Sequence, residues 1–183
     1  MILKVARLGH PIVRTAARQV TAEEIRSHGF QVLIDSMVET MHEYSGVGLA
    51  ATQIHLPLQV AVLEVERNPR YPDAPPVPLT VLINPVVTIL DNHTIDGYEG
   101  CLSIPDMRGM VPRFTRLRVE ALGRDAQPLD IMAEGFHARV IQHETDHLKG
   151  EVYLDRMRDM RTLSHLLEFQ RYALEPATEA ERK

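Results

Sequence analysis

The chain has 183 residues, 44% of them hydrophobic, and its 20 Lys and Arg residues against 25 Asp and Glu residues give a formal net charge of −5. This length predicts one domain, residues 1–183, with a core of its own, and the acidic balance disfavours nucleic acid as a partner or substrate. The lack of an apolar run of roughly 20 residues, of a signal peptide and of a second cysteine predicts a cytoplasmic protein with no membrane partner and no intrachain disulfide.

The first predicted element is an amphipathic helix that ends near Tyr44. Thr21 and Glu24 have the spacing of a capping box, which satisfies backbone N–H groups at a helix start. Apolar residues then recur at helical spacing through Met41. Gly29 is a poor helix former, so we expect a break near it, between a short first turn and the main helix.

Several short runs of apolar and β-branched residues predict β-strands. Residues 116–122 alternate apolar and polar residues, which is typical of an antiparallel strand with one buried face. Residues 123–126 predict a hairpin turn, and the five prolines in residues 68–78 predict a surface loop because proline cannot donate to a ladder. The predicted strands are residues 60–65, 81–83, 86–90, 116–122 and 129–132.

Two helices follow the strands. Gly135 precedes a helical run that starts at about Phe136, and Gly150 stands where a glycine commonly ends a helix. A last helix is predicted from about residue 159 to residue 174, before Pro176. The order helix, strands, helix, helix is typical of an α+β fold rather than of repeated βαβ units.

The second half of the helix after Gly135 carries the sequence His143-Glu144-Thr145-Asp146-His147. Histidines four residues apart leave a helix on the same face, so both imidazoles can bind one metal ion. Two surface histidines without a metal would give the same spacing. A catalytic metal commonly has three protein ligands and one open position, so a third ligand is needed.

The spacing alone leaves the third ligand open. A metzincin protease would have a histidine where this chain has Tyr153, which counts against that class. Glu168 is a candidate for a thermolysin-like site, although such secreted enzymes need a targeting segment. Cys101, the only cysteine, is either a small buried apolar residue or a thiolate ligand.

Three segments together resemble the signature motifs of the peptide deformylases, in the order that this family has them. They are residues 46–53, 99–103 and 142–147, which read Gly-Val-Gly-Leu-Ala-Ala-Thr-Gln, Glu-Gly-Cys-Leu-Ser and Gln-His-Glu-Thr-Asp-His. The resemblance runs from about Lys4 to Arg156. It implies an α+β fold with antiparallel β-sheets around a central helix that carries the HExxH motif, an N-terminal helix and a C-terminal helix.

The resemblance implies one divalent metal ion per chain, held by Cys101, His143 and His147. In many bacteria the native metal of the family is iron(II), and zinc, nickel or cobalt can occupy the same site. A thiolate with two imidazoles suits several of these ions.

The implied reaction removes the N-formyl group from the N-terminal formylmethionine of newly made polypeptides and releases formate. Hydroxide held by the ion attacks the formyl carbon, and Glu144 acts as general base and then as general acid. The side-chain amide of Gln53 and the backbone N–H of Leu102 stabilise the oxyanion.

The resemblance also implies a substrate site. Glycines in the first motif would let the main chain approach an extended peptide that pairs as an added strand. Asp146 and Arg113 are candidates for a supporting ion pair beside the metal. An apolar slot for the methionine side chain is predicted near Val47, Arg108, Phe136 and Val140. The substrate-binding residues indicated are Gly46, Val47, Gly48, Glu99, Gly100, Arg108 and Val140.

Two other functions remain compatible with the HExxH motif. A metallopeptidase would cleave internal bonds of N-blocked peptides, and a non-enzymatic metal-binding or ribosome-associated protein would bind metal without turnover. Some deformylases dock on the ribosome through a basic C-terminal helix, but residues 156–183 hold six Lys and Arg against five Asp and Glu. This near-neutral tail argues against docking, and its apolar residues predict a helix packed on the domain or on another subunit, in a monomer or a weak homodimer.

Overall fold

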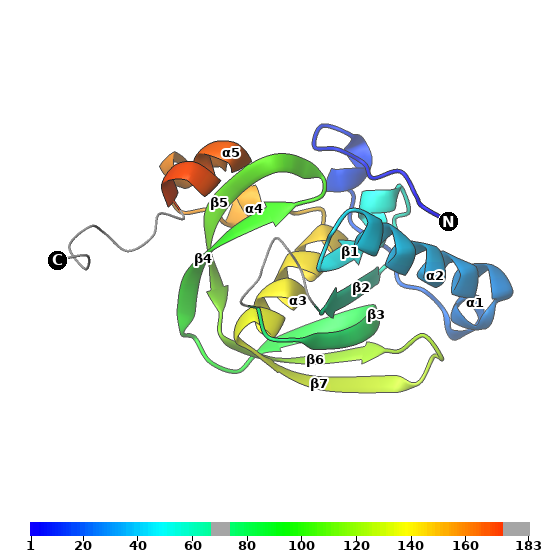
Figure 1. Cartoon of the computed structure of the whole chain (residues 1–183). Helices are drawn as coiled ribbons and strands as arrows, with labels where there is room; N and C mark the ends of the chain where they lie inside the picture. The colour runs from blue at the N-terminus through cyan, green and yellow to red at the C-terminus, as the bar shows by residue number, and fades with distance from the viewer. Residues whose placement is uncertain (67–73, 174–183) are drawn as a thin grey trace.

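The computed structural model describes residues 1–66 and 74–173, and in it two antiparallel sheets enclose one helix (Figure 1). The larger sheet has the strand order β1-β2-β3-β6-β7, and the smaller one has the order β4-β5-β8. This confirms the predicted α+β class. The strands are β1 Gly48–Ala50, β2 Val60–Val65, β3 Val77–Ile89, β4 Thr94–Cys101, β5 Ile104–Phe114, β6 Arg116–Leu122, β7 Pro128–Glu134 and β8 Ser164–His165. The helical segments are η1 Pro11–Arg14, α1 Ala22–Arg26, α2 His28–Glu43, η2 Ala51–Ile54, α3 Gly135–Leu148, α4 Tyr153–Arg156, η3 Met160–Thr162, α5 Leu166–Glu168 and η4 Phe169–Ala173.

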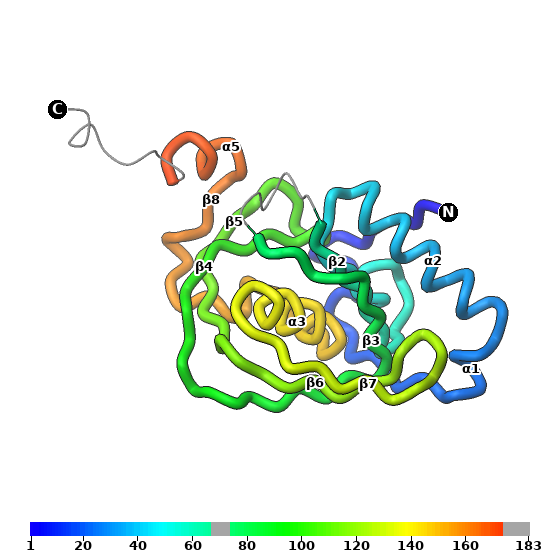
Figure 2. The backbone as a smooth tube through the Cα atoms, turned by 60° about the horizontal axis from the view of Figure 1, so that its bottom comes forward, coloured from blue at the N-terminus to red at the C-terminus, as the bar shows by residue number. Residues whose placement is uncertain are grey.

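Helices α2 and α3 cover opposite faces of the larger sheet. Alternate residues of a strand point to opposite faces. On β2, Val60 and Val62 belong to the core cluster that contains α2, whereas Leu63 and Val65 belong to the cluster that contains α3. Figure 2 shows the consequence, with the strands forming an open ring around α3. The helix that carries the HExxH motif is therefore central, as predicted.

The predicted break in the first helix lies at Ser27 and not at Gly29. Ser27 has extended backbone angles, its N–H donates to the carbonyl of Glu24, and its side chain accepts from the N–H of Phe30. One serine thus ends α1 and begins α2. Gly29 lies inside α2, where a Cβ would meet no atom within 4 Å.

The runs predicted as two strands, residues 81–83 and 86–90, belong to the single strand β3. Its register against β6 shifts between Ile83 and Val86, where Asn84 has a positive φ of 53°. The side chain of Asn84 accepts from the N–H of Val20 and donates to its carbonyl, which holds this irregularity in place. In the predicted proline-rich loop, residues 67–73 lie outside the described residues, and Val77 and Pro78 already belong to β3.

The hairpin of β4 and β5 has no counterpart among the predicted strands. Its inward positions include Glu99 on β4 and Arg113 on β5, which are both buried. Charged residues at inward positions erase the hydrophobic alternation that identifies a strand. This hairpin places the second signature motif beside α3, because β4 ends at Cys101.

The C-terminal helix predicted for residues 159–174 is interrupted. After η3, Ser164 and His165 form β8, which pairs with Arg108 and Met107 of β5. Helical structure then resumes in α5 and η4, and residue 174 lies outside the described part of the chain. The ring of Phe169 lies 4.6 Å from that of Tyr98 on β4, so the segment packs on the domain through this residue. Met160 and Leu167, two of the apolar residues that predicted such packing, are exposed instead.

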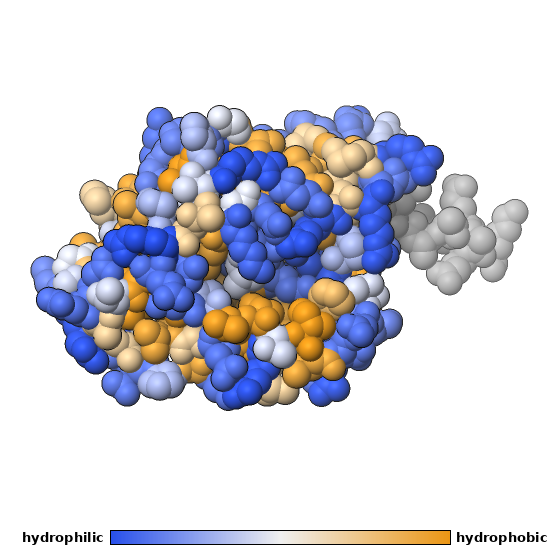
Figure 3. Space-filling view, turned by 180° about the vertical axis from the view of Figure 1, so that it is seen from behind, coloured by the Kyte–Doolittle hydropathy of each residue, from blue (hydrophilic) through white to orange (hydrophobic). Residues whose placement is uncertain are grey.

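The surface of the molecule carries both hydrophilic and hydrophobic side chains. Seen from behind, most of the molecule is covered by hydrophilic side chains, and hydrophobic ones gather on its lower part (Figure 3). Within residues 1–66 and 74–173, no helix has the length and apolar character needed to cross a membrane.

Candidate metal centre

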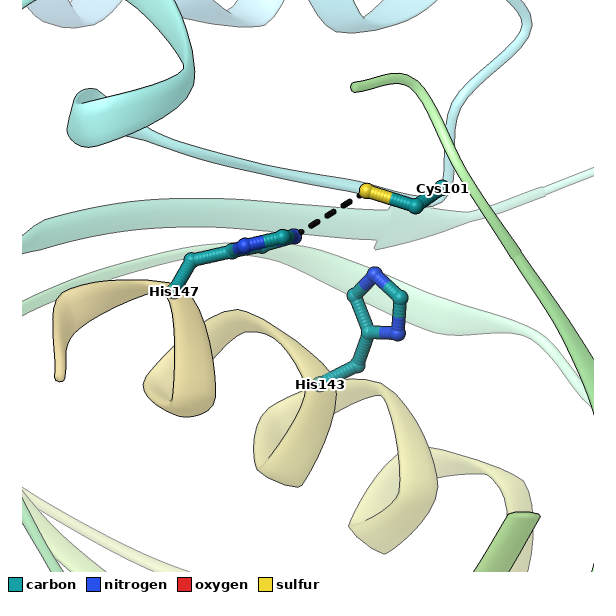
Figure 4. A group of neighbouring side chains, drawn as sticks. All are labelled: Cys101, His143 and His147. Carbon is teal, nitrogen blue, oxygen red and sulfur yellow. Dashed lines mark hydrogen bonds between the residues drawn. The ribbon is translucent and has the colours of Figure 1, made fainter. Parts of the chain in front are cut away.

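The thiol of Cys101 and the imidazoles of His143 and His147 point toward one another (Figure 4). The Sγ atom of Cys101 lies 3.3 Å from Nε2 of His147, and one donor atom from each of the three residues lies within 4.8 Å of the others. Around a tetrahedral zinc, a sulfur at about 2.3 Å and a nitrogen at about 2.0 Å from the metal lie about 3.5 Å apart. The three side chains therefore have the spacing and the chemistry to bind one divalent ion.

Local structure brings these donors together. Both histidines lie on α3 one turn apart, and the cysteine ends the neighbouring strand β4. After α3 the chain turns at Gly150, which has a φ of 76°. A Cβ there would lie 2.6 Å from the carbonyl oxygen of Arg14, so only glycine fits, as its predicted place at the helix end required.

Glu99 connects the candidate ligands to the rest of the hairpin. Its Oε2 lies 2.9 Å from Nδ1 of His143, and it accepts two hydrogen bonds from Arg113 and one from Arg139. Burial alone would raise the pKa of Glu99, but the hydrogen bonds and charges of His143 and Arg113 outweigh it and hold that pKa well below its ordinary value. A carboxylate on Nδ1 leaves Nε2 of His143 available for a metal.

A second buried carboxylate supports the same arginine. Asp146 accepts from Arg113 at 2.6 Å and from Arg156 at 2.8 Å. The side chains of Arg113 and Asp146 are 4% and 6% exposed, so their predicted pairing is confirmed as a buried contact. Burial opposes the charge of Asp146, yet the two arginines lower its pKa. Arg113 thus links two carboxylates, one from β4 and one from α3.

The donors also influence one another. Burial raises the pKa of the Cys101 thiol, but the charge of His147 and hydrogen bonds from both histidines lower it well below 9.0. Burial lowers the pKa of His143, while Cys101 and Glu99 raise it well above 6.5. The site therefore favours a thiolate beside positive charge, and a thiolate is the form of cysteine that binds metals.

Glu144 lies beside the three donors and is also buried. Its Oε2 has no hydrogen-bond partner among the described residues, and burial is the largest of the causes that raise its pKa to about 6. A Cβ at Gly48 on β1 would lie 2.3 Å from its Oε1. The glycine of the first motif is therefore needed at that position because the carboxylate of Glu144 lies against it.

A pocket opens beside the candidate metal ligands. It is lined by residues of all three motifs and by one face of α3, where residues 136, 140 and 143 follow at helical spacing. Arg139 shares this face and was not among the predicted site residues, although the same spacing indicates it. The lining is Gly46, Val47, Gly48, Gln53, Glu99, Gly100, Cys101, Leu102, Phe136, Arg139, Val140, His143 and Glu144.

Arg108 is not among the residues that line this pocket, and its assignment to the methionine slot stays a prediction. Its side chain lies against Gly100, where a Cβ would be 2.1 Å from Nη1 of Arg108. It lines a neighbouring hollow that also includes Cys101 and Leu102 and is completed by Arg7 and Leu166. The strand pairing of β5 with β8 turns this part of β5 toward the C-terminal segment.

Gln53 and Leu102 both lie at the metal side of the pocket. Gln53 is buried on η2, its Oε1 accepts from the N–H of Ala50, and its Nε2 lies 3.4 Å from Sγ of Cys101 and 3.2 Å from Oγ of Ser103. The carbonyl of Leu102 accepts a hydrogen bond from Arg7. An amide N–H group is thus close to the sulfur of Cys101, and Leu102 is the residue that follows this cysteine.

The positions that would supply a third ligand in the two protease classes lie elsewhere. Tyr153, which stands where a metzincin would have its third histidine, belongs to α4 and is buried with its ring stacked at 6.3 Å from that of His143. Glu168 lies on α5, is exposed, and pairs with Arg171. The third donor next to the two histidines is Cys101.

Comparisons with known proteins agree with one another. A family model described as polypeptide deformylase matches residues 2–162. The chain is 46% identical to peptide deformylase 1 of Nitrosomonas europaea over 165 residues, which cover 90% of this chain and 93% of that one. It is 47% identical to peptide deformylase 1 of Bordetella pertussis over 161 residues, which cover 87% of this chain and 90% of that one.

Solved structures show the same likeness. The crystal structure of a class I type b peptide deformylase from Acinetobacter baumannii, with Met-Ala-Ser bound, matches with a TM-score of 0.83 at 38% identity. The match covers 86% of this chain and 99% of that one. The peptide deformylase of Thermotoga maritima matches with a TM-score of 0.76 at 32% identity, over 87% of this chain and 99% of that one.

Proposed function

Since the chain belongs to the peptide deformylase family and is a metallohydrolase that removes N-formyl groups, we propose that its substrates are the N-terminal formylmethionines of newly made polypeptides. The observation that carries this proposal is the convergence of one thiol and two imidazoles beside a pocket that all three motifs line. The Acinetobacter baumannii relative holds Met-Ala-Ser, and removal of formyl from formyl-Met-Ala-Ser would leave this peptide. For this chain, the single domain, the cytoplasmic location and the monomeric or weakly dimeric state stay predictions.

We propose that Cys101, His143 and His147 hold one divalent ion, with iron(II) as the native metal. The donor set accepts zinc, nickel or cobalt as well, because a thiolate with two imidazoles suits each of them. When bound, such an ion lowers the pKa of a coordinated water from 15.7 to about 7 and polarises a carbonyl group.

Glu144 is proposed to move the protons of the reaction. It follows His143 directly, and the free Oε2 and the pKa of about 6 suit a carboxylate that accepts a proton and returns it near neutral pH. The proton that Glu144 accepts from water would pass to the nitrogen of the scissile amide, which leaves as a free amine. The burial that raises its pKa also excludes bulk water from this transfer.

Gln53 and Leu102 are proposed to stabilise the oxyanion. The Nε2 of Gln53 lies beside the sulfur of Cys101, so its N–H groups are close to the position that the formyl oxygen would take. The backbone N–H of Leu102 is the second proposed donor. A donor of this kind is typically worth about 2.7 to 4 kcal/mol of barrier.

The remaining pocket residues are proposed to bind the peptide. Val47, Phe136 and Val140 would receive the methionine side chain, while Gly46, Gly48 and Gly100 would let the main chain approach the peptide. Glu99 lines the pocket but is also bonded to His143, so we assign it a positioning role toward that ligand. Formyl, the smallest acyl group, would be selected over acetyl by crowding at the metal end.

The test is formate release from formyl-Met-Ala-Ser by protein purified and loaded with iron(II) without oxygen. We expect Cys101→Ser to lose both bound metal and turnover. Glu144→Gln should keep the metal and lose turnover by at least about hundredfold, as expected for general base catalysis. The exposed Glu134→Gln, on β7, is the matched control and should behave as the wild type.

Two results would contradict the proposal. One is a metal-loaded wild type that releases no formate. The other is cleavage of internal bonds in N-blocked peptides that survives Cys101→Ser, since a peptidase using only the HExxH motif would behave in this way.

A further inference from the structure

Arg139 places a charged group in the pocket wall next to two apolar residues, Phe136 and Val140. It lies on α3 one turn before His143, on the same helix face as Phe136 and Val140. Its side chain is only 13% exposed. An arginine so placed has to satisfy its N–H groups within the protein or through a ligand.

The two strands of the hairpin hold the guanidinium in place. Its Nη1 donates to Glu99 and to the carbonyl of Val111 at 2.9 Å each and more weakly to the carbonyl of Gly97 at 3.3 Å, and its Nη2 donates to the carbonyl of Ile95 at 2.6 Å. Gly97 leaves the space, because a Cβ at that position would lie 2.8 Å from Nη2 and 2.9 Å from Cζ. The guanidinium is thus fixed against β4 and cannot swing freely into solvent.

These contacts leave part of the guanidinium unused. A guanidinium has five N–H donors, and the acceptors above take both on Nη1 and one on Nη2. Among the described residues, no acceptor takes a hydrogen bond from the Nε–H or from the second N–H on Nη2 of Arg139. A largely buried side chain that lines a pocket and keeps spare donors is suited to a ligand that brings an acceptor.

We infer that Arg139 is a specificity-determining residue, which donates a hydrogen bond to an acceptor atom near the end of the substrate's N-terminal side chain. This inference rests on the proposed function of the pocket. The thioether sulfur of methionine is a weak acceptor, and the oxygen of methionine sulfoxide is a strong one. The pocket therefore accepts N-formyl peptides that begin with methionine sulfoxide, and it favours both over a hydrocarbon side chain of the same length. A purely apolar slot would instead reject the sulfoxide.

The wild-type enzyme gives the first test. Formate release is measured with formyl peptides of sequence X-Ala-Ser in which X is methionine, methionine sulfoxide or norleucine, the hydrocarbon of the same length. We expect kcat/KM for the sulfoxide to equal or exceed that for norleucine. A sulfoxide value more than about tenfold below the norleucine value would overturn the inference, as an apolar wall predicts.

The second test removes the donor and keeps the length of the side chain. Arg139→Met should lower the ratio of the sulfoxide kcat/KM to the norleucine kcat/KM by at least about tenfold, which corresponds to about 1.4 kcal/mol. A purely structural role through Glu99 would lower all three substrates equally, and an unchanged ratio would overturn the inference. Arg116→Met, which removes an exposed arginine of β6, is the matched control and should leave every value unchanged.

Gly97→Ala provides a variant that keeps the arginine. Its Cβ would displace the guanidinium, so the same ratio should fall even though Arg139 is present. Failure of the proposed function is distinguishable from failure of this inference. The former would appear as no formate release from the formylmethionine peptide by the wild type, and the latter as release with ratios that do not depend on Arg139.

Discussion

Gly48→Ala should lower turnover by about hundredfold through its effect on Glu144. The added Cβ would lie 2.3 Å from Oε1 of Glu144, whereas ordinary contact begins at 3.4 Å. The carboxylate must therefore retreat by about 1 Å, and it can do so because its Oε2 has no hydrogen-bond partner among the described residues. A misplacement of about 1 Å in a reacting group costs on the order of a hundredfold in rate, or about 2.7 kcal/mol of barrier.

The assay is steady-state formate release by the iron-loaded variant, with metal content measured on the same sample. We expect kcat to fall while bound metal stays at the wild-type level, since Cys101, His143 and His147 are not displaced. Gly29→Ala is the matched control, because its Cβ would meet no atom within 4 Å inside α2. That variant should keep full activity and gain about 0.5–1 kcal/mol of unfolding free energy from better helix propensity.

A double variant tests the assigned cause. If Gly48→Ala acts through Glu144, it should add little to the loss already produced by Glu144→Gln, because both changes remove the same contribution. A Gly48→Ala enzyme within threefold of the wild type would refute the reasoning. Fully additive losses in the double variant would also refute it.

The remaining predictions concern the buried charges. Arg113→Met should lower the unfolding free energy by about 3–5 kcal/mol in urea titrations, because Glu99 and Asp146 would lose their buried partner. Arg116→Met breaks an exposed pair and should cost about 0–1 kcal/mol, so equal losses would contradict the burial argument. The folded-state pKa values of Glu99 and Asp146 lie below their ordinary values of 4.5 and 3.8, so their contribution to stability is present at neutral pH and is lost as pH falls below about 4. The unfolding free energy of the metal-free wild type should therefore fall more steeply below pH 4 than that of Asp146→Asn, and parallel slopes would argue against this account.

Local sequence patterns predicted the elements whose signal depends on neighbours in the chain. The strands β2 and β6 have the predicted bounds, and α3 begins at Gly135 and ends at Leu148, two residues before Gly150. These patterns succeed because strand alternation, helical spacing and a left-handed glycine are set within a few residues. The same locality made His143 and His147 recognisable as a pair.

Hydrophobic alternation did not predict the strands in which charged residues are buried. In the hairpin of β4 and β5, Glu99 and Arg113 occupy inward positions and satisfy each other, so the segment lacks the hydrophobic alternation of a strand. The prediction of one continuous C-terminal helix was wrong for a related reason. Ser164 and His165 leave the helical pattern to pair with β5, which a local pattern cannot anticipate.

The sequence by itself determined the α+β class, the helix with its two histidines and, through the three motifs, the cysteine that joins them. Only the tertiary structure decided that Gly48 borders Glu144, that Arg108 lies against Gly100 and that Arg139 lies in the pocket wall. The reason is physical. These contacts form between different elements of the chain. The close approach of β1 and α3, which are far apart in the sequence, therefore cannot be predicted from the local spacing of residues.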